Sequence, residues 1–218
     1  MNFYLRVLLS LTILFPAIIG IIRFKKINDA YYPFIIYIWV GAINELLSVI
    51  LLIWRYSNII NLNVYLLIEA MLLMWQFTLW RFFGKSKILR KLLYAALLSF
   101  WLTENFLLYS ITRYDSYFTI FYSTIFTFIS ISSINQLIVT ERKSLLQNPK
   151  FIICAAFVIY FTIVILSEVF WLYGVSQSVA FSNYVISISN ITNFIAIILY
   201  TLAILWMPIK HRFTLPSS

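Results

Sequence analysis

This 218-residue chain contains seven apolar segments, each long enough to form a membrane-spanning helix. A helix needs about 20 apolar residues to cross a hydrocarbon core of about 30 Å. Hydrophobic residues make up 63% of the chain and charged residues 11%, and the stretches between segments are short. The pattern predicts an all-α integral membrane protein, with residues 1–218 forming a single seven-helix transmembrane domain. The predicted helices cover residues 4–22, 31–54, 64–83, 92–112, 116–139, 151–173 and 184–207.

The first of these segments contains a proline in its body, Pro16. Proline has no backbone N–H, and its ring clashes with the carbonyl four residues earlier. We therefore expect the first helix to be kinked near Pro16, with neighbouring helices satisfying the freed carbonyl.

The sixteen Lys and Arg residues are divided unequally between alternate loops. Cytoplasmic loops collect positive charge, so we expect the N-terminus outside and the C-terminus in the cytoplasm. The net charge of +9 then reflects membrane-flanking loops and does not indicate a nucleic-acid partner. The composition, rich in Ile, Phe and Asn, suggests a multi-pass protein of a bacterial inner membrane. Three basic residues lie on the outer side (Arg6, Arg55, Arg113) and thirteen on the inner side (Arg23, Lys25, Lys26, Arg81, Lys85, Lys87, Arg90, Lys91, Arg142, Lys143, Lys150, Lys210, Arg212).

Four glutamates lie inside the apolar segments, where no Lys, Arg or His is at hand to neutralise them: Glu45, Glu69, Glu104 and Glu168. A carboxylate inside a membrane is costly and marks a functional site by default. With a rise of about 1.5 Å per residue, all four fall outward of the segment centres, by about 3 to 9 Å. We expect them to line a polar cavity that opens toward the outer side.

Further polar and aromatic residues accompany these glutamates along the predicted helical faces. Residues spaced by three, four or seven positions share one side of a helix. A tryptophan one turn from a carboxylate, as at Trp101 and Trp171, suits an organic cation, which is attracted by charge and by the face of the ring. The predicted ligand-binding residues are Asn44, Glu45, Glu69, Gln76, Trp101, Glu104, Asn105, Glu168, Trp171, Asn190 and Asn193.

Three functional readings follow from this pattern. The first is an outward-facing acidic and aromatic pocket that binds a proton, a metal ion or an organic cation for transport or sensing. The second is a membrane-embedded enzyme acting on a lipid or isoprenoid, in which Glu45, Glu104 and Glu168 supply acid and base. The third is a structural or assembly subunit whose glutamates bond neighbouring helices together. Expected partners are the bilayer, a small cationic or lipidic ligand, and a membrane signalling or transport protein.

Several cofactors and chemistries are unsupported by the residues present. The last segment has no lysine that could carry retinal, and the only histidine, His211, lies in the tail, so haem and histidine-based zinc sites have no ligands in the membrane. Glu, Asn and Ser oxygens leave Ca²⁺, Mg²⁺ or Mn²⁺ open, without a defined metal site. We expect no cofactor and no nucleic-acid partner.

Overall fold

A computed structural model describes residues 3–84, 86–141, 144–173 and 179–210. Lys85, Arg142, Lys143, His211 and Arg212 lie outside these ranges. Within the described ranges, five helices are long and apolar enough to cross a membrane. By helix length and composition, the chain is a multi-pass membrane protein. The five helices are α3 (Tyr32–Ile53), α4 (Ile59–Leu79), α6 (Ser116–Thr140), α7 (Pro149–Leu172) and α8 (Val179–Trp206).

The first segment is broken into two shorter helices, α1 (Phe3–Leu11) and α2 (Leu14–Arg23). Pro16 cannot donate to the carbonyl of Thr12, which instead accepts from Phe15 N at 3.0 Å. The Thr12 hydroxyl turns back to the Leu9 carbonyl at 2.5 Å. The predicted kink is confirmed, and it falls one turn before the proline. The freed carbonyl is satisfied within its own segment and not, as expected, by a neighbouring helix.

The fourth segment combines α5 (Lys87–Leu102) with a short π-helix, η2 (Thr103–Leu108). The Ser86 side chain caps the start of α5 by accepting from Leu89 N at 3.4 Å. The segment therefore begins five residues before the predicted start and ends four residues before the predicted end. π-Helical turns are rare and often lie at functional sites. Glu104 and Asn105 both lie in this one.

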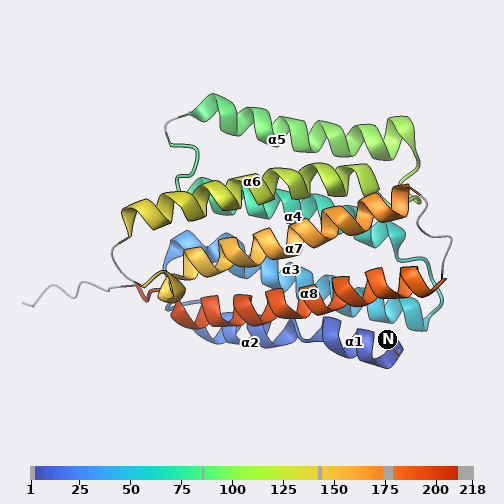
Figure 1. Cartoon of the computed structure of the whole chain (residues 1–218), viewed down its shortest axis with the longest axis horizontal. Coiled ribbons are helices and arrows are strands. Elements are labelled where there is room, and N and C mark those ends of the chain that lie inside the picture. The colour runs from blue at the N-terminus through green and yellow to red at the C-terminus, as the bar shows by residue number, and fades with distance from the viewer. Residues whose placement is uncertain (1–2, 85, 142–143, 174–178, 211–218) are drawn as a thin grey trace, which may run out of the picture.

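The helices run side by side along the long axis of the molecule (Figure 1). α7 packs between α6 and α8, α3 packs on α4, and α1 and α2 pack against α3 and α8. α5 lies at one edge of the bundle, against α4 and α6. Successive segments alternate in direction, so the N-terminus shares one end of the bundle with residues 54–58 and 109–115. We call this the N-terminal end; the other, which we call the basic end, carries residues 24–31, 80–84 and 144–148.

At the basic end, the last described residues are bonded to the first loop. Ile27 and Ile209 form an antiparallel bridge, and Lys210 N donates to the Lys26 carbonyl at 2.8 Å. The Lys210 ammonium forms a salt bridge with Asp29 and donates to the Tyr32 hydroxyl at 2.6 Å. The hydrogen bond to the Asp29 carboxylate raises the pKa of Lys210 above its usual range. These contacts fix the end of α8 against the turn between α2 and α3.

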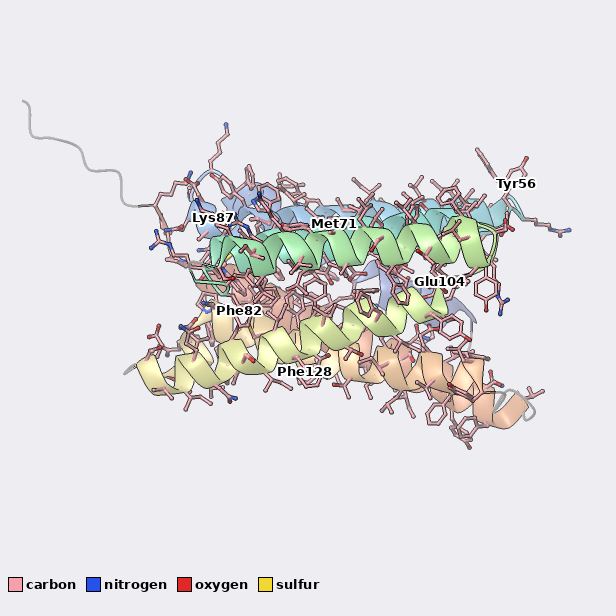
Figure 2. All side chains as sticks on the ribbon, turned by 90° about the horizontal axis from the view of Figure 1, so that it is seen from above. Tyr56, Met71, Phe82, Lys87, Glu104 and Phe128 are labelled. Carbon is pink, nitrogen blue, oxygen red and sulfur yellow. The ribbon has the colours of Figure 1, made fainter. Side chains whose placement is uncertain are left out.

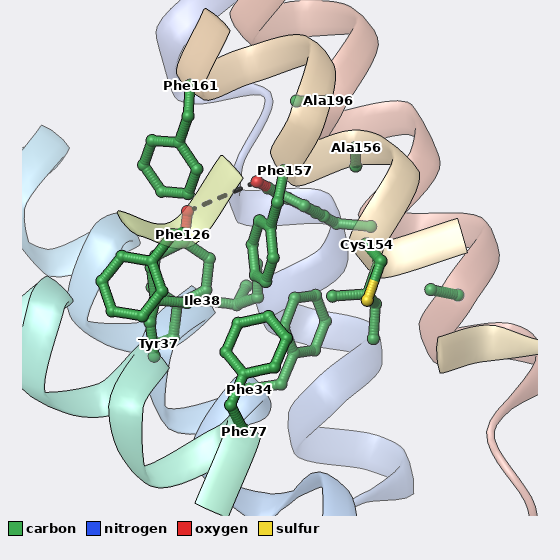
Figure 3. Close-up of a cluster of buried hydrophobic side chains, with 14 of the residues drawn as sticks. Phe34, Tyr37, Ile38, Phe77, Phe126, Cys154, Ala156, Phe157, Phe161 and Ala196 are labelled. Atoms are coloured by element: carbon green, nitrogen blue, oxygen red, sulfur yellow. Dashed lines mark hydrogen bonds between the residues drawn. The ribbon is translucent and has the colours of Figure 1, made fainter. Parts of the chain in front are cut away.

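A cluster of aromatic side chains fills the centre of the bundle (Figure 3). Phe34, Phe77, Phe126, Phe157 and Phe161 come from α3, α4, α6 and α7, and each is 0% exposed. Phe77 stacks on Phe126 with ring centroids 6.0 Å apart. Aromatic pairs at such distances contribute about 0.5–1.5 kcal/mol beyond the area they bury. Tyr37, Tyr122 and Tyr200 pack edge-on against these rings, and the Tyr122 hydroxyl donates to Glu69.

Candidate functional site

Glu104 holds the start of α6 from a neighbouring segment. Its two carboxylate oxygens accept from the backbone N–H groups of Tyr117 at 3.1 Å and Phe118 at 2.5 Å. These are among the first N–H groups of α6, which have no partner within their own helix. Asp115, the residue before α6, makes no side-chain cap of its own. Glu104 therefore acts as the helix cap, and Figure 2 shows it where η2 approaches α6.

Asn63, on α4, organises the loop that leads into α6. Its amide nitrogen donates to the carbonyls of Ile111 at 3.0 Å and Arg113 at 2.6 Å. Its amide oxygen accepts from Asp115 N at 3.2 Å, and its own carbonyl accepts from the Trp101 indole at 2.9 Å. The side chain is 0% exposed. One residue thus joins α4, α5 and the loop 109–115.

Asn105 and Asp115 complete this network. The Asn105 amide donates to the Trp101 carbonyl at 3.1 Å and to the Asp115 carboxylate. Burial raises the pKa of the Asp115 carboxyl above its usual range, although the Asn105 hydrogen bond acts against that effect. We call Asn63, Trp101, Glu104, Asn105 and Asp115 the α6-start network. Its polar groups are bonded to one another or to backbone, as buried polar groups are in stable proteins.

Glu168 lies on α7 beside the same helix start. It is 9% exposed and faces Ser116 and Tyr114. A carboxylate near the first turn of a helix is favoured by the partial positive charge of the free N–H groups. Trp171, one turn further along α7, is 42% exposed on the outside of the bundle. The structure therefore places Glu168 near Glu104 but leaves Trp171 away from both.

A second polar group surrounds Glu45. Glu45, Ser10, Asn190 and Asn193 line one cavity of about 400 Å³ between α1, α3 and α8. The Ser10 hydroxyl faces the Glu45 carboxylate. The predicted site residues Glu45, Asn190 and Asn193 therefore come together, although they are about 145 residues apart in the chain. We call this cavity the Glu45 pocket. Its remaining wall is formed by Val7, Ser48, Val49, Leu52, Tyr56 and Asn58.

Asn44 does not line the Glu45 pocket, but it is hydrogen-bonded through Asn61 to residues that do. Its amide oxygen accepts from Asn61 at 2.8 Å, and Asn61 also donates to Asn58 at 3.0 Å. Asn58 in turn donates to the Ser48 hydroxyl at 2.7 Å. This chain of hydrogen bonds fixes Ser48 and Asn58 at the junction of α3 and α4.

Glu69 is buried in the middle of the bundle, apart from both groups. It is 1% exposed, and one carboxylate oxygen accepts from the Tyr122 hydroxyl at 3.1 Å. The other oxygen has no hydrogen-bond partner within the described part of the chain. Tyrosine hydroxyls from several helices surround it; those in electrostatic range belong to Tyr37, Tyr65, Tyr114, Tyr122, Tyr160 and Tyr200.

Gln76 lies on the same helix as Glu69 but toward the basic end. Its amide oxygen accepts from Phe34 N at 2.8 Å, and its amide nitrogen donates to the Ala30 carbonyl at 2.7 Å. Gln76 thus caps the start of α3 from α4, as Glu104 caps the start of α6 from η2. It takes no part in the Glu45 pocket.

The predicted site residues therefore occupy separate places and do not surround a single cavity. The sequence indicated the Glu45, Asn190 and Asn193 group through their similar depth and their places on the polar faces of the predicted helices. Asn63, Asp115 and the tyrosines Tyr65 and Tyr122 beside Glu69 were not predicted. The helical spacing of Tyr65 and Glu69, four residues apart, was a usable signal for one member of that ring.

Comparison of the chain with protein-family models, with curated proteins and with solved structures finds no match.

Proposed function

We propose that the protein binds a small organic cation in the Glu45 pocket, for transport or for sensing. The observation that carries the proposal is the lining of this cavity, in which one carboxylate meets the side chains of Ser10, Asn190 and Asn193. A carboxylate supplies the charge, and the amide and hydroxyl oxygens present the negative ends of their dipoles to a cation. A few convergent polar groups in a largely apolar cavity are typical of small-molecule sites.

The charge and size of the pocket favour an organic cation with a single positive charge. The described lining contains one acidic residue, and no group of three His, Cys, Asp or Glu side chains suited to a metal ion occurs in the described ranges. Divalent ions such as Ca²⁺ take six to eight oxygen ligands. A volume of about 400 Å³ also lies within the range of organic ligand sites, about 300–1,000 Å³.

An apolar groove next to the pocket supports a ligand that has a hydrocarbon part. This groove has a volume of about 1,050 Å³ and lies between the broken first segment and α3. It shares Val7, Val49 and Leu52 with the Glu45 pocket, so the two spaces are adjacent. An amphiphile could place its ammonium beside Glu45 and its chain along the groove, where burial contributes about 0.8 kcal/mol per CH₂ group.

The distribution of basic residues supports the orientation in which the Glu45 pocket opens on the outer side. The basic end carries Arg23, Lys25 and Lys26 at the end of α2 and just after it, Lys150 at the start of α7 and Lys210 after α8. Because cytoplasmic loops collect positive charge, this excess of Lys and Arg favours a cytoplasmic location for the basic end. We infer that the chain resides in a bacterial inner membrane and meets its ligand from outside.

The test is binding of n-hexyltrimethylammonium to the protein in a nonionic detergent, measured by calorimetry. We expect Glu45→Gln to weaken binding at least tenfold, since tenfold corresponds to about 1.4 kcal/mol, a modest value for one charge pair. Glu141→Gln, which changes an exposed carboxylate at the end of α6, should bind as the parent does. The neutral n-hexanol should bind parent and Glu45→Gln alike. Equal affinity of Glu45→Gln and the parent for the cation would refute the proposal.

A further inference from the structure

Glu69 is the buried acidic group whose bonding is least complete. Of its two oxygens, one accepts from Tyr122, and the other has no partner at hydrogen-bond distance and angle within the described part of the chain, although the Tyr37 hydroxyl also faces the carboxyl. A carboxylate that remained charged here would need hydrogen-bond donors on both oxygens or a nearby cation. A neutral carboxylic acid needs fewer hydrogen-bond donors, because one oxygen can carry the proton while the other accepts from the tyrosine.

Every element packed around Glu69 contributes a titratable side chain that faces its carboxyl group. These groups are hydroxyls, and within the described ranges no Lys or Arg acts on this carboxylate. The facing groups are Tyr37 on α3, Tyr65 on α4, Tyr122 on α6, Tyr160 on α7, Tyr200 on α8 and Tyr114 in the loop before α6. Tyrosine hydroxyls both donate and accept, so they can solvate a proton without supplying a fixed charge.

Two of these tyrosines connect Glu69 with the Glu45 pocket. Tyr65 and Tyr160 lie in electrostatic range of both glutamates. The Tyr65 hydroxyl lies 3.4 Å from the position that a Cβ on Gly41 would take, one turn before Glu45 on α3. Tyr160 lines a cavity of about 190 Å³ together with Asn190 and Asn193, which also line the Glu45 pocket. Tyr65 and Tyr160 thus lie near both acidic positions, and Asn190 and Asn193 line both cavities.

We propose that Glu69 is a proton-binding site, occupied in the cation-free protein and emptied when a cation enters the Glu45 pocket. The second half of this proposal rests on the proposed function. A proton on Glu69 and a cation beside Glu45 would place two added positive charges in one poorly screened region, so each disfavours the other. The carboxylic O–H bond breaks, the proton passes along the tyrosine hydroxyls to water in the pocket, and Glu69 is left as a carboxylate. Binding one cation therefore releases at most one proton.

The experiment is infrared spectroscopy of the carboxylic C=O stretch in the full chain, with and without n-hexyltrimethylammonium. We expect the cation-free parent to show a protonated-carboxyl band that Glu69→Gln lacks. Addition of the cation should reduce this band in the parent and release protons into a weakly buffered solution. Glu104→Gln should retain the cation-sensitive band, because Glu104 belongs to the α6-start network. Tyr65→Phe should retain the band and slow its loss.

The outcomes separate the two proposals. If Glu69→Gln leaves the protonated-carboxyl bands of the parent unchanged, Glu69 carries no proton and the inference is wrong, whatever the cation does. If the cation binds but the Glu69 band persists, the coupling is wrong and Glu69 is a structural acid. If the cation does not bind the parent, the proposed function and the coupling both fail, while the Glu69 band still decides whether the site holds a proton. Should Glu69→Gln not fold, Tyr122→Phe must shift the band, because it removes the hydrogen bond to the carboxyl.

Discussion

The α6-start network and the region of Glu45 and Glu69 both contain glutamates in apolar helices, but they differ in how those glutamates are bonded. Both oxygens of Glu104 accept from backbone N–H groups. Glu69 has one oxygen without a partner within the described residues, and Glu45 lines an open cavity. A buried polar group with complete bonding contributes to stability, whereas one with incomplete bonding costs free energy. The comparison separates carboxylates that hold the fold from those available to a ligand or a proton.

The largest effect should follow removal of Asn63 from the α6-start network. Asn63→Ala leaves two loop carbonyls and the Asp115 N–H without their partner. We expect the free energy of unfolding in mixed micelles to fall by about 3 kcal/mol, at about 1 kcal/mol for each group. Asn135→Ala, at an exposed position on α6, is the matched control and should change stability little. Equal losses in the two variants would show that the network does not stabilise the bundle.

A smaller loss is expected at Gln76, the other cap supplied from a neighbouring helix. Gln76→Leu leaves Phe34 N and the Ala30 carbonyl unbonded at a site that is 0% exposed. We expect about 2 kcal/mol of lost stability. The control is Gln136→Leu, which lies on an exposed face of α6 and should be close to neutral. A Gln76→Leu protein as stable as the parent would contradict the assigned capping role.

Replacing single carboxylates with amides should then distinguish the two regions directly. Glu104→Gln keeps one acceptor oxygen for two N–H groups, so we expect a loss of about 1 kcal/mol, the usual value of a helix cap. Glu45→Gln should leave unfolding within about 0.5 kcal/mol of the parent, as substitutions outside a bonded network do. Chemical denaturation of both variants measures this difference. A larger loss of stability for Glu45→Gln than for Glu104→Gln would show that Glu45, and not Glu104, is the carboxylate that stabilises the fold.

The smallest effect is expected at the basic end, where Lys210 and Asp29 form an exposed salt bridge. The pKa of Lys210 is raised in the folded protein, so the contribution of the bridge is complete below the ordinary lysine pKa of about 10.4. It is lost as the pH rises through the folded-state value. Asp29→Asn should lower the melting temperature slightly at pH 7, less in high salt, and not at all at strongly alkaline pH. A difference that grows with pH would contradict this assignment.

Much of the fold was predictable because helix length and hydropathy are local properties of the chain. The span 116–139 agrees with α6 to within one residue, and the break near Pro16 follows from the missing N–H of proline. The π-helix η2 was not predictable, because its geometry depends on tertiary contacts with the loop 109–115 that no local sequence property encodes. Segment bounds near Lys87 were also missed, since charged residues extend α5 beyond its apolar part.

Depth in the membrane predicted which site residues come together only where residues at the same depth also lie on neighbouring helices. Glu45, Asn190 and Asn193 lie at similar depths on helices that are in fact neighbours. Depth also grouped Glu104 with them, but depth says nothing about rotation, and Glu104 faces the start of α6. Gln76 was grouped with Glu69 by spacing along one helix, although the seven-position offset places Gln76 nearer the basic end, against the start of α3. Partners from other helices decide the role of each polar residue.

The most direct test of the account compares cation binding by Glu45→Gln and Glu104→Gln, two variants with the same chemical change in the two regions. Calorimetric titration with n-hexyltrimethylammonium gives the affinity of each variant, at a temperature where both are folded. We predict that Glu104→Gln binds within about twofold of the parent although it is less stable, and that Glu45→Gln binds at least tenfold more weakly although it is as stable, where tenfold is about 1.4 kcal/mol. Retained binding in Glu45→Gln together with lost binding in Glu104→Gln would contradict the assignment of the two carboxylates.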